Sequence, residues 1–199
     1  MKVKTYVVSH FQTNCYLGYS ENDKDCFIVD PGAKSLQLVD DVAALGLAPK
    51  YLILTHGHGD HTGGVDFIKE KYPDIQLVAG INEKDFLYDA RKSFGQGKIL
   101  PDILVNDGDV LECGDMELKI IATPGHTPGG ICILSEGILF SGDTLFRGSI
   151  GRTDFYGGDY GLIIKSLHKL MELPGDTVVM PGHMGSSTIE YEKRHNPFV

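Results

Sequence analysis

The sequence predicts an α/β fold in which two sheets carry helices on their outer faces. Strand-like runs and amphipathic helical segments are interleaved along the whole chain, and about ten short strands and four helices can be recognised. Histidines gather in loops at strand ends, which favours a histidine-rich seam between the sheets. No polar linker, change in composition or internal repeat divides the chain, so we expect a single domain over residues 1–199.

The first part of the chain is predicted to form three strands, a helix and a fourth strand. Residues 2–20 and 25–30 alternate or run apolar with Val, Tyr, Ile and Phe, which indicates three short strands. Apolar residues then recur at helical spacing over 36–45, and Ser35 is placed to cap that helix. The continuous apolar run 51–54 is typical of a buried strand.

The middle of the chain alternates between helix and strand. The pattern over 65–72 suits an amphipathic helix that ends before Pro73. Residues 75–79 are predicted as a strand, and 82–92 as a helix opened by an asparagine cap. A polar, glycine-containing connection over 91–101 follows.

The remainder is strand-rich and closes with a helix and a strand. Short turns join four predicted strands into an antiparallel meander over 103–111, 116–122, 131–135 and 138–141. Residues 160–171 have the pattern of a strong helix, and 177–180 that of a strand that ends in Pro181-Gly182-His183.

Composition excludes several classes of protein. The 199 residues, 42% of them hydrophobic, suffice to build a buried core, and the formal net charge of −9 disfavours nucleic acid and anionic membranes as partners. There is no apolar run of about 18 residues and no secretory signal, so we expect a cytoplasmic protein with no membrane partner. The four cysteines form no C-x-x-C pair and are interpreted as small core residues.

Five histidines and two aspartates lie in four glycine-bounded loops at predicted strand ends. These loops are 55–61, 124–126, 142–144 and 181–183. The first places four candidate ligands within six residues, an arrangement for which Gly57 and Gly59 supply the tight backbone turn. Imidazole and carboxylate without thiolate point to an open catalytic site for zinc, iron or manganese. Seven donors exceed one four-coordinate ion and predict two divalent ions that share a carboxylate.

These motifs resemble those of the metallo-β-lactamase superfamily and, within it, the glyoxalase II branch of hydroxyacylglutathione hydrolases. The similar segments are THGHGDHTGG, TPGHTPGG, SGDTLF and PGH, and the resemblance runs from the VDPG segment at 29–32 to His183. It implies a four-layer αβ/βα sandwich of two mixed sheets with helices outside, and metals in a cleft at one edge of the sheets.

The resemblance also assigns roles to residues. The first metal set is His56, His58 and His126, the second is Asp60, His61 and His183, and Asp143 bridges the two metals. Asp60 and Asp143 are the catalytic carboxylates, since Asp60 can also orient the attacking water. Asp30 orients a ligand imidazole or caps a turn, and Thr55 and Thr144 are weaker candidates for such support.

The activity implied is hydrolysis of a thioester such as S-D-lactoylglutathione by a dinuclear metal centre, most simply zinc. Arg152 and Tyr156 resemble the basic residue and tyrosine that contact the thiol moiety in glyoxalase II, although their spacing is shifted. We expect no C-terminal glutathione-binding helical domain and hence a more open pocket. A persulfide dioxygenase with a single iron and a lactonase remain as alternatives on the same scaffold, and a non-catalytic metal-binding module as an alternative of another class.

Overall fold

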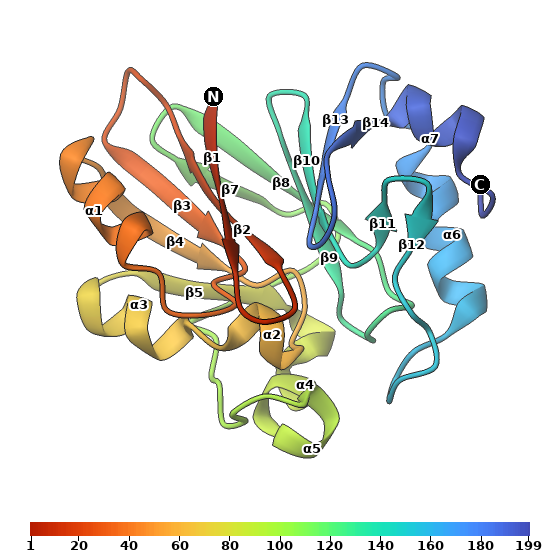
Figure 1. Ribbon diagram of the computed structural model, residues 1–199, viewed down its shortest axis with the longest axis horizontal. Helices are drawn as coiled ribbons and strands as arrows, with labels where there is room; N and C mark the ends of the chain where they lie inside the picture. The colour runs from red at the N-terminus through yellow and green to blue at the C-terminus, as the bar shows by residue number, and fades with distance from the viewer.

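Two six-stranded sheets face each other, and helices cover the outer face of each (Figure 1). The computed structural model describes the whole chain, residues 1–199. Both sheets mix parallel and antiparallel pairs, so the predicted four-layer αβ/βα sandwich is confirmed. None of the helices combines the length and apolarity needed to cross a membrane.

The N-terminal sheet has the strand order β1-β2-β3-β4-β5-β6. Its strands are β1 (Lys2–Val8), β2 (Thr13–Tyr19), β3 (Asp25–Val29), β4 (Ala48–Ile53), β5 (Gln76–Gly80) and β6 (Ile103–Val105). The pairs from β3 to β6 are parallel, so the carboxyl ends of these strands meet at one edge. Helices α1 (Leu36–Ala44) and α3 (Val65–Lys71) cover the outer face, and Ser35 caps α1 as predicted.

The C-terminal sheet has the order β14-β13-β10-β9-β8-β7. Its strands are β7 (Val110–Cys113), β8 (Met116–Ala122), β9 (Ile131–Ser135), β10 (Ile138–Gly142), β13 (Val178–Pro181) and β14 (Ser187–Thr188). Strands β7 to β10 form the predicted antiparallel meander, and β13 runs parallel to β10. Strands β8, β10 and β13 therefore point the same way and end at the same edge.

Three apolar clusters separate the four layers. One lies between the N-terminal sheet and helices α1 and α3, and one between the two sheets, where Phe27 and Phe140 meet edge to face at 5.7 Å. The third packs the C-terminal sheet against α6 (Tyr160–Leu170) and α7 (Ile189–His195). All four cysteines are free and buried, which confirms their interpretation as core residues.

Two predicted elements are wrong in extent. The predicted strand 103–111 is two strands in different sheets, β6 and β7, because Gly108 adopts φ of 84° in the turn between them. The predicted helix 82–92 is a 3₁₀ turn, η1 (Ile81–Glu83), followed by α4 (Lys84–Tyr88) and α5 (Ala90–Ser93). Asp89 interrupts it with an extended backbone, and its side chain caps α5.

Several short elements had no prediction. They are α2 (Gly59–Thr62) within the histidine cluster, the two-residue strands β11 (Leu145–Phe146), β12 (Ser149–Ile150) and β14, and the helix α7. The totals of 14 strands and 7 α-helices thus exceed the expected counts, because elements of two to seven residues carry too little apolar periodicity to be recognised.

Candidate metal centre

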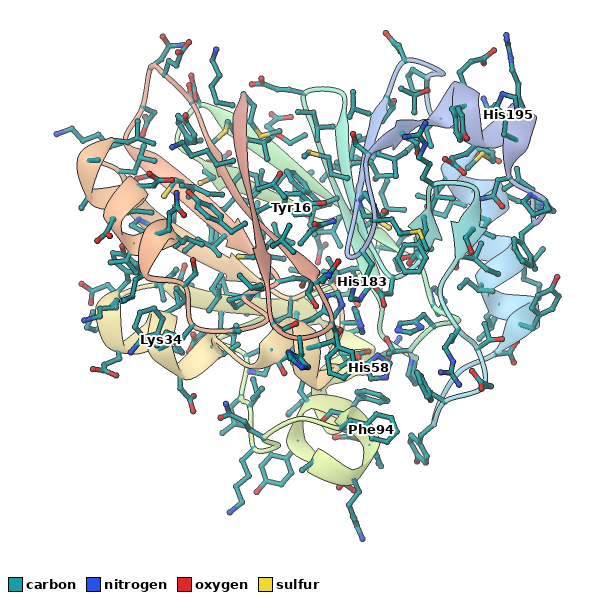
Figure 2. All side chains as sticks on the ribbon, in the orientation of Figure 1. Tyr16, Lys34, His58, Phe94, His183 and His195 are labelled. Atoms are coloured by element: carbon teal, nitrogen blue, oxygen red, sulfur yellow. The ribbon has the colours of Figure 1, made fainter.

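The predicted ligands meet where the carboxyl ends of strands from both sheets converge. His56, His58, Asp60 and His61 follow β4, the last two on the short helix α2. His126, Asp143 and His183 follow β8, β10 and β13 of the opposite sheet. Figure 2 shows His58 and His183 in this region between the sheets. The structure therefore brings all seven predicted residues together.

The first group of donors is His56, His58 and His126, whose ligand atoms lie within 4.8 Å of one another. His58 Nδ1 is 2.9 Å from His126 Nε2, and His56 Nε2 is buried without a hydrogen-bond partner. Two nitrogen donors of one tetrahedral zinc ion lie about 3.4 Å apart, because each is about 2.0–2.1 Å from the metal. The spacing of this group is compatible with a shared ion.

The second group is Asp60, His61 and His183. His61 Nε2 is 3.3 Å from His183 Nε2, which is in turn 3.3 Å from Asp60 Oδ2. Asp143 lies between the groups: Oδ1 is 3.3 Å from His61 Nε2, and Oδ2 is 3.6 Å from His126 Nε2. A carboxylate in this position can serve both groups at once.

Hydrogen bonds at the far ring nitrogen turn three imidazoles toward the centre. His61 Nδ1 donates to Asp30 Oδ2 at 2.9 Å, and His126 Nδ1 donates to the Arg152 carbonyl at 2.7 Å. His183 Nδ1 faces the Phe11 carbonyl at 3.2 Å. These acceptors have no hydrogen to give, so Nδ1 of each ring carries a proton and Nε2 is the ring nitrogen that faces the cluster.

Asp30 is held rigidly behind the cluster. Its carboxylate accepts the Thr55 backbone N–H at 2.8 Å and the Thr55 hydroxyl at 2.6 Å in addition to His61. Its backbone is left-handed, with φ of 50°, at the turn that ends β3. Asp tolerates this conformation better than most residues, and such strain concentrates at functional sites. Thr144 is the other residue expected to support a ligand. Its hydroxyl is hydrogen-bonded to the Thr123 hydroxyl and not to a candidate metal ligand.

Glycines allow the ligand loops to pack against one another. A Cβ at Gly59 would lie 2.5 Å from the Phe94 carbonyl oxygen, and one at Gly182 would overlap Asp143 Oδ1 and His61 Cε1. Any side chain at Gly182 would thus displace two of the candidate ligands. These glycines explain how donors from two sheets converge on one point.

The electrostatics divide the histidines into two kinds. Burial, reinforced by neighbouring imidazoles, lowers the pKa of His56 well below its ordinary value and that of His58 to about 4. Burial also opposes charge on His183, but Asp143 and Asp60 outweigh it and raise its pKa to about 9. The first group is thus held neutral, the form that binds metal, while carboxylates around the second group attract positive charge.

A pocket of about 630 Å³ opens beside the donors and is lined by His58, Asp60, Asp143 and His183 among others. Arg152 reaches its wall, where the guanidinium is paired with Asp154 at 2.7 Å. Tyr156 does not line this pocket: it packs on Phe86 and lies beneath Lys92. The structure therefore places one of the two predicted substrate contacts at the site.

The remaining three histidines lie apart from the candidate ligands. His10, His168 and His195 are exposed, and Figure 2 shows His195 at the upper right, away from His58 and His183. None of them belongs to a group of converging metal donors.

Glu83 is a buried residue near the centre that sequence analysis missed. Its side chain is fully buried and accepts hydrogen bonds from the Gly57 N–H at 2.8 Å, the Thr127 hydroxyl at 3.0 Å and the Gly129 N–H at 2.8 Å. It thereby ties the turn between His56 and His58 to the loop of His126. A single glutamate outside any motif gave no signal of this role.

The comparison of the sequence with known families decides the assignment. The metallo-β-lactamase superfamily matches residues 8–183, which include every candidate ligand. The chain belongs to the metallo-β-lactamase superfamily. The chain is a metal-dependent hydrolase, and its converging His and Asp residues form groups that can hold a metal ion.

Curated relatives match this chain over its whole length, among them two that are named as hydrolases. Hydroxyacylglutathione hydrolase GloC of Haemophilus influenzae is 38% identical over 100% of this chain and 98% of its own length. The probable metallo-hydrolase YqgX of Bacillus subtilis is 35% identical over 100% of this chain and 98% of its own length.

Solved structures of related proteins share the fold of this chain. The BLEG-1 B3 metallo-β-lactamase superposes with a TM-score of 0.92 at 34% identity, with 99% of each chain covered. ETHE1 from Myxococcus xanthus gives 0.86 at 29% identity, covering 99% of this chain and 84% of its own. TTHA1623, solved in a di-iron-bound form, gives 0.87 at 30% identity, covering 98% of this chain and 100% of its own.

Proposed function

We propose that this metallohydrolase is a dinuclear thioesterase that cleaves S-(2-hydroxyacyl)glutathiones such as S-D-lactoylglutathione. The observation that carries the proposal is the pair of complete donor groups, one on each side of Asp143, at the wall of a single pocket. The end-to-end similarity to a protein named hydroxyacylglutathione hydrolase supports the choice of substrate. We also propose that residues 1–199 form one domain, in keeping with an alignment that spans 100% of this chain and 98% of that relative.

We propose two divalent ions at this centre, zinc in the simplest case and iron or manganese otherwise. His56, His58 and His126 would hold one, Asp60, His61 and His183 the other, and Asp143 would contact both. When bound, such ions lower the pKa of a water molecule and polarise the thioester carbonyl. The donor set fits them: nitrogen and oxygen atoms only, neutral imidazoles on one side and carboxylates on the other.

The residues of the chain then have separate tasks in the reaction. Asp60, whose Oδ2 also accepts the Thr13 hydroxyl at 3.2 Å, faces the pocket and orients the attacking water. The water loses a proton to the solvent as its oxygen bonds to the acyl carbon. The C–S bond then breaks, and the thiolate departs with the electron pair. Because a thiolate is a good leaving group, no general acid is required for this step. Asp30 holds His61 in the tautomer that the centre needs.

The primary test is turnover together with metal content on one sample. Purified protein should hydrolyse S-D-lactoylglutathione and contain about two divalent metal ions per chain by elemental mass spectrometry. Dialysis against a chelator should abolish turnover, and adding zinc, iron or manganese back should restore it. A fully metal-loaded sample that leaves the thioester intact would refute the glutathione assignment.

A persulfide dioxygenase is the second candidate, because ETHE1 of Myxococcus xanthus shares this fold at 29% identity. The complete second donor group favours the dinuclear hydrolase. Oxygen uptake on addition of glutathione persulfide, together with a single iron per chain, would favour the dioxygenase. A lactonase on the same scaffold would be recognised by lactone hydrolysis in the parallel assay.

Arg152 provides a narrower test of substrate binding. If its guanidinium pairs with a glutathione carboxylate, Arg152→Ala should raise the KM for S-D-lactoylglutathione about three- to tenfold and leave kcat within about twofold. Steady-state kinetics measure both values. An unchanged KM would show that this side chain does not bind the substrate.

A further inference from the structure

The pocket beside the candidate ligands has an apolar wall that the proposed glutathione substrate does not explain. Six apolar side chains line it: Phe11, Phe94, Phe146, Ile150, Phe155 and Met184. They come from the turn after β1, the end of α5, the segment over 146–155 and the loop after β13. Four separate segments therefore contribute apolar surface to one cavity.

Much of this surface is open to water. The exposed fraction is 72% for Phe11, 64% for Phe94 and 60% for Met184. Moving each of these large apolar side chains from water into an apolar contact lowers the free energy. Neighbouring exposed apolar groups beside a reactive centre mark a ligand site. The occupant must cover them in the bound state.

The apolar wall reaches the reactive centre itself. Phe94 and Phe155 pack edge to face at 5.5 Å, and both rings contact the His58 imidazole, at 6.0 and 5.6 Å. Figure 2 shows Phe94 below His58 in this view. The Phe94 backbone is left-handed, with φ of 52°, and its carbonyl abuts Gly59. A group that packs on these rings lies next to the bond that is cleaved.

Away from the candidate ligands, the pocket offers a single charged side chain to its occupant. Arg152 is the one Lys or Arg among its lining residues. Its guanidinium makes two hydrogen bonds to Asp154 and stacks 4.1 Å above the Phe155 ring. Apart from Gly59 and the candidate ligands, the rest of the lining consists of the six apolar side chains. This wall therefore favours an uncharged apolar group next to the centre.

We propose that this site prefers thioesters that carry an aryl or branched alkyl group beside the scissile bond, packed among Phe11, Phe94 and Phe155. The inference rests on the proposed thioesterase function and narrows its substrate class. The apolar group can belong to the acyl part or to the leaving thiol, since both adjoin the reacting carbon.

The decisive experiment measures binding without reaction. Calorimetry on the metal-loaded protein compares two unreactive thioethers, S-benzylglutathione and S-methylglutathione. The benzyl compound should bind at least about tenfold more tightly, a difference of about 1.4 kcal/mol. The double variant Phe11→Ala/Phe94→Ala should lose most of this preference. Both side chains are largely exposed, so their truncation leaves folding within about 0.5 kcal/mol.

A matched control is Tyr160→Ala, which removes an aromatic ring that is 57% exposed on α6 and outside the pocket lining. It should keep the full preference. Equal affinities of the two thioethers for the unaltered protein, or an undiminished preference in the double variant, would overturn the inference.

Rates of thioester cleavage show whether the apolar group belongs to the acyl part or to the thiol. They also test the proposed function separately from the binding preference. Faster cleavage of S-mandeloylglutathione than of S-lactoylglutathione places the group on the acyl side. Faster cleavage of the lactoyl thioester of benzyl mercaptan than of N-acetylcysteamine places it on the thiol. A binding preference with no thioester cleaved would refute the proposed function and leave the apolar specificity of the pocket standing.

Discussion

Asp143→Ala is expected to lower kcat/KM for the thioester at least about a thousandfold, equivalent to about 4 kcal/mol of transition-state stabilisation. The Asp143 carboxylate reaches both donor groups, through Oδ1 to His61 and Oδ2 to His126 and His183. Its loss removes one negative ligand from each ion site at the same time. Metal content should fall together with activity, which elemental analysis of the same sample measures.

Asp143→Asn provides the informative comparison. The amide keeps the volume and one acceptor oxygen, so a purely steric role for Asp143 would leave this variant nearly active. If charge and two-sided contact matter, Asn should be almost as impaired as Ala. Asp176→Ala, an exposed aspartate before β13, is the matched control and should behave like the unaltered protein. Normal activity in Asp143→Ala would remove this residue from the centre.

The positions of the candidate ligands could be predicted because they depend on local patterns and strand direction. The H-x-H-x-D-H string follows a continuous apolar run, and the other donors follow the strands β8, β10 and β13. Strands that point the same way deliver their terminal residues to one edge whatever the details of packing. The donors of the centre are therefore largely visible in the sequence.

The pocket wall and the element boundaries depend on long-range packing and could not be predicted in the same way. Phe11, Phe94 and Met184 are distant in sequence and share no motif, so only the folded chain shows that they line one cavity. The predicted strand over 103–111 failed because it joined two apolar runs, 103–105 and 110–111, across the polar turn 106–109, although the two runs belong to opposite sheets. Periodicity detects a strand but does not tell which sheet it joins.

Glu83→Ala is the second change with a large expected effect. The alanine leaves three donors without an acceptor inside the protein, the N–H groups of Gly57 and Gly129 and the Thr127 hydroxyl. Buried donors left unpaired cost about 1–3 kcal/mol each, so we expect a loss of at least about 3 kcal/mol in the free energy of unfolding. Urea denaturation measures this loss. Because these donors flank His56, His58 and His126, binding of the ion by that group should weaken as well.

The pH dependence of the unfolding free energy tests whether the pKa of Glu83 changes when the protein folds. Burial, only partly offset by the three hydrogen bonds, raises the pKa of Glu83 from 4.5 to about 7. A raised pKa in the folded state means that the folded protein binds the proton more tightly than the unfolded chain. The resulting stabilisation is fully present below about pH 4.5 and is lost as pH rises through about 7.

Glu83→Gln removes this titration while keeping the shape of the side chain. The unfolding free energy of the unaltered protein minus that of Glu83→Gln should therefore decrease by up to about 3 kcal/mol between pH 4.5 and 8. Both proteins are unfolded in urea with chelator present, so that metal binding contributes to neither. Subtraction cancels the titration of the histidines, which both proteins share. A difference that stays constant across this range would show that Glu83 has the same pKa in the folded and the unfolded protein, so that burial does not raise it.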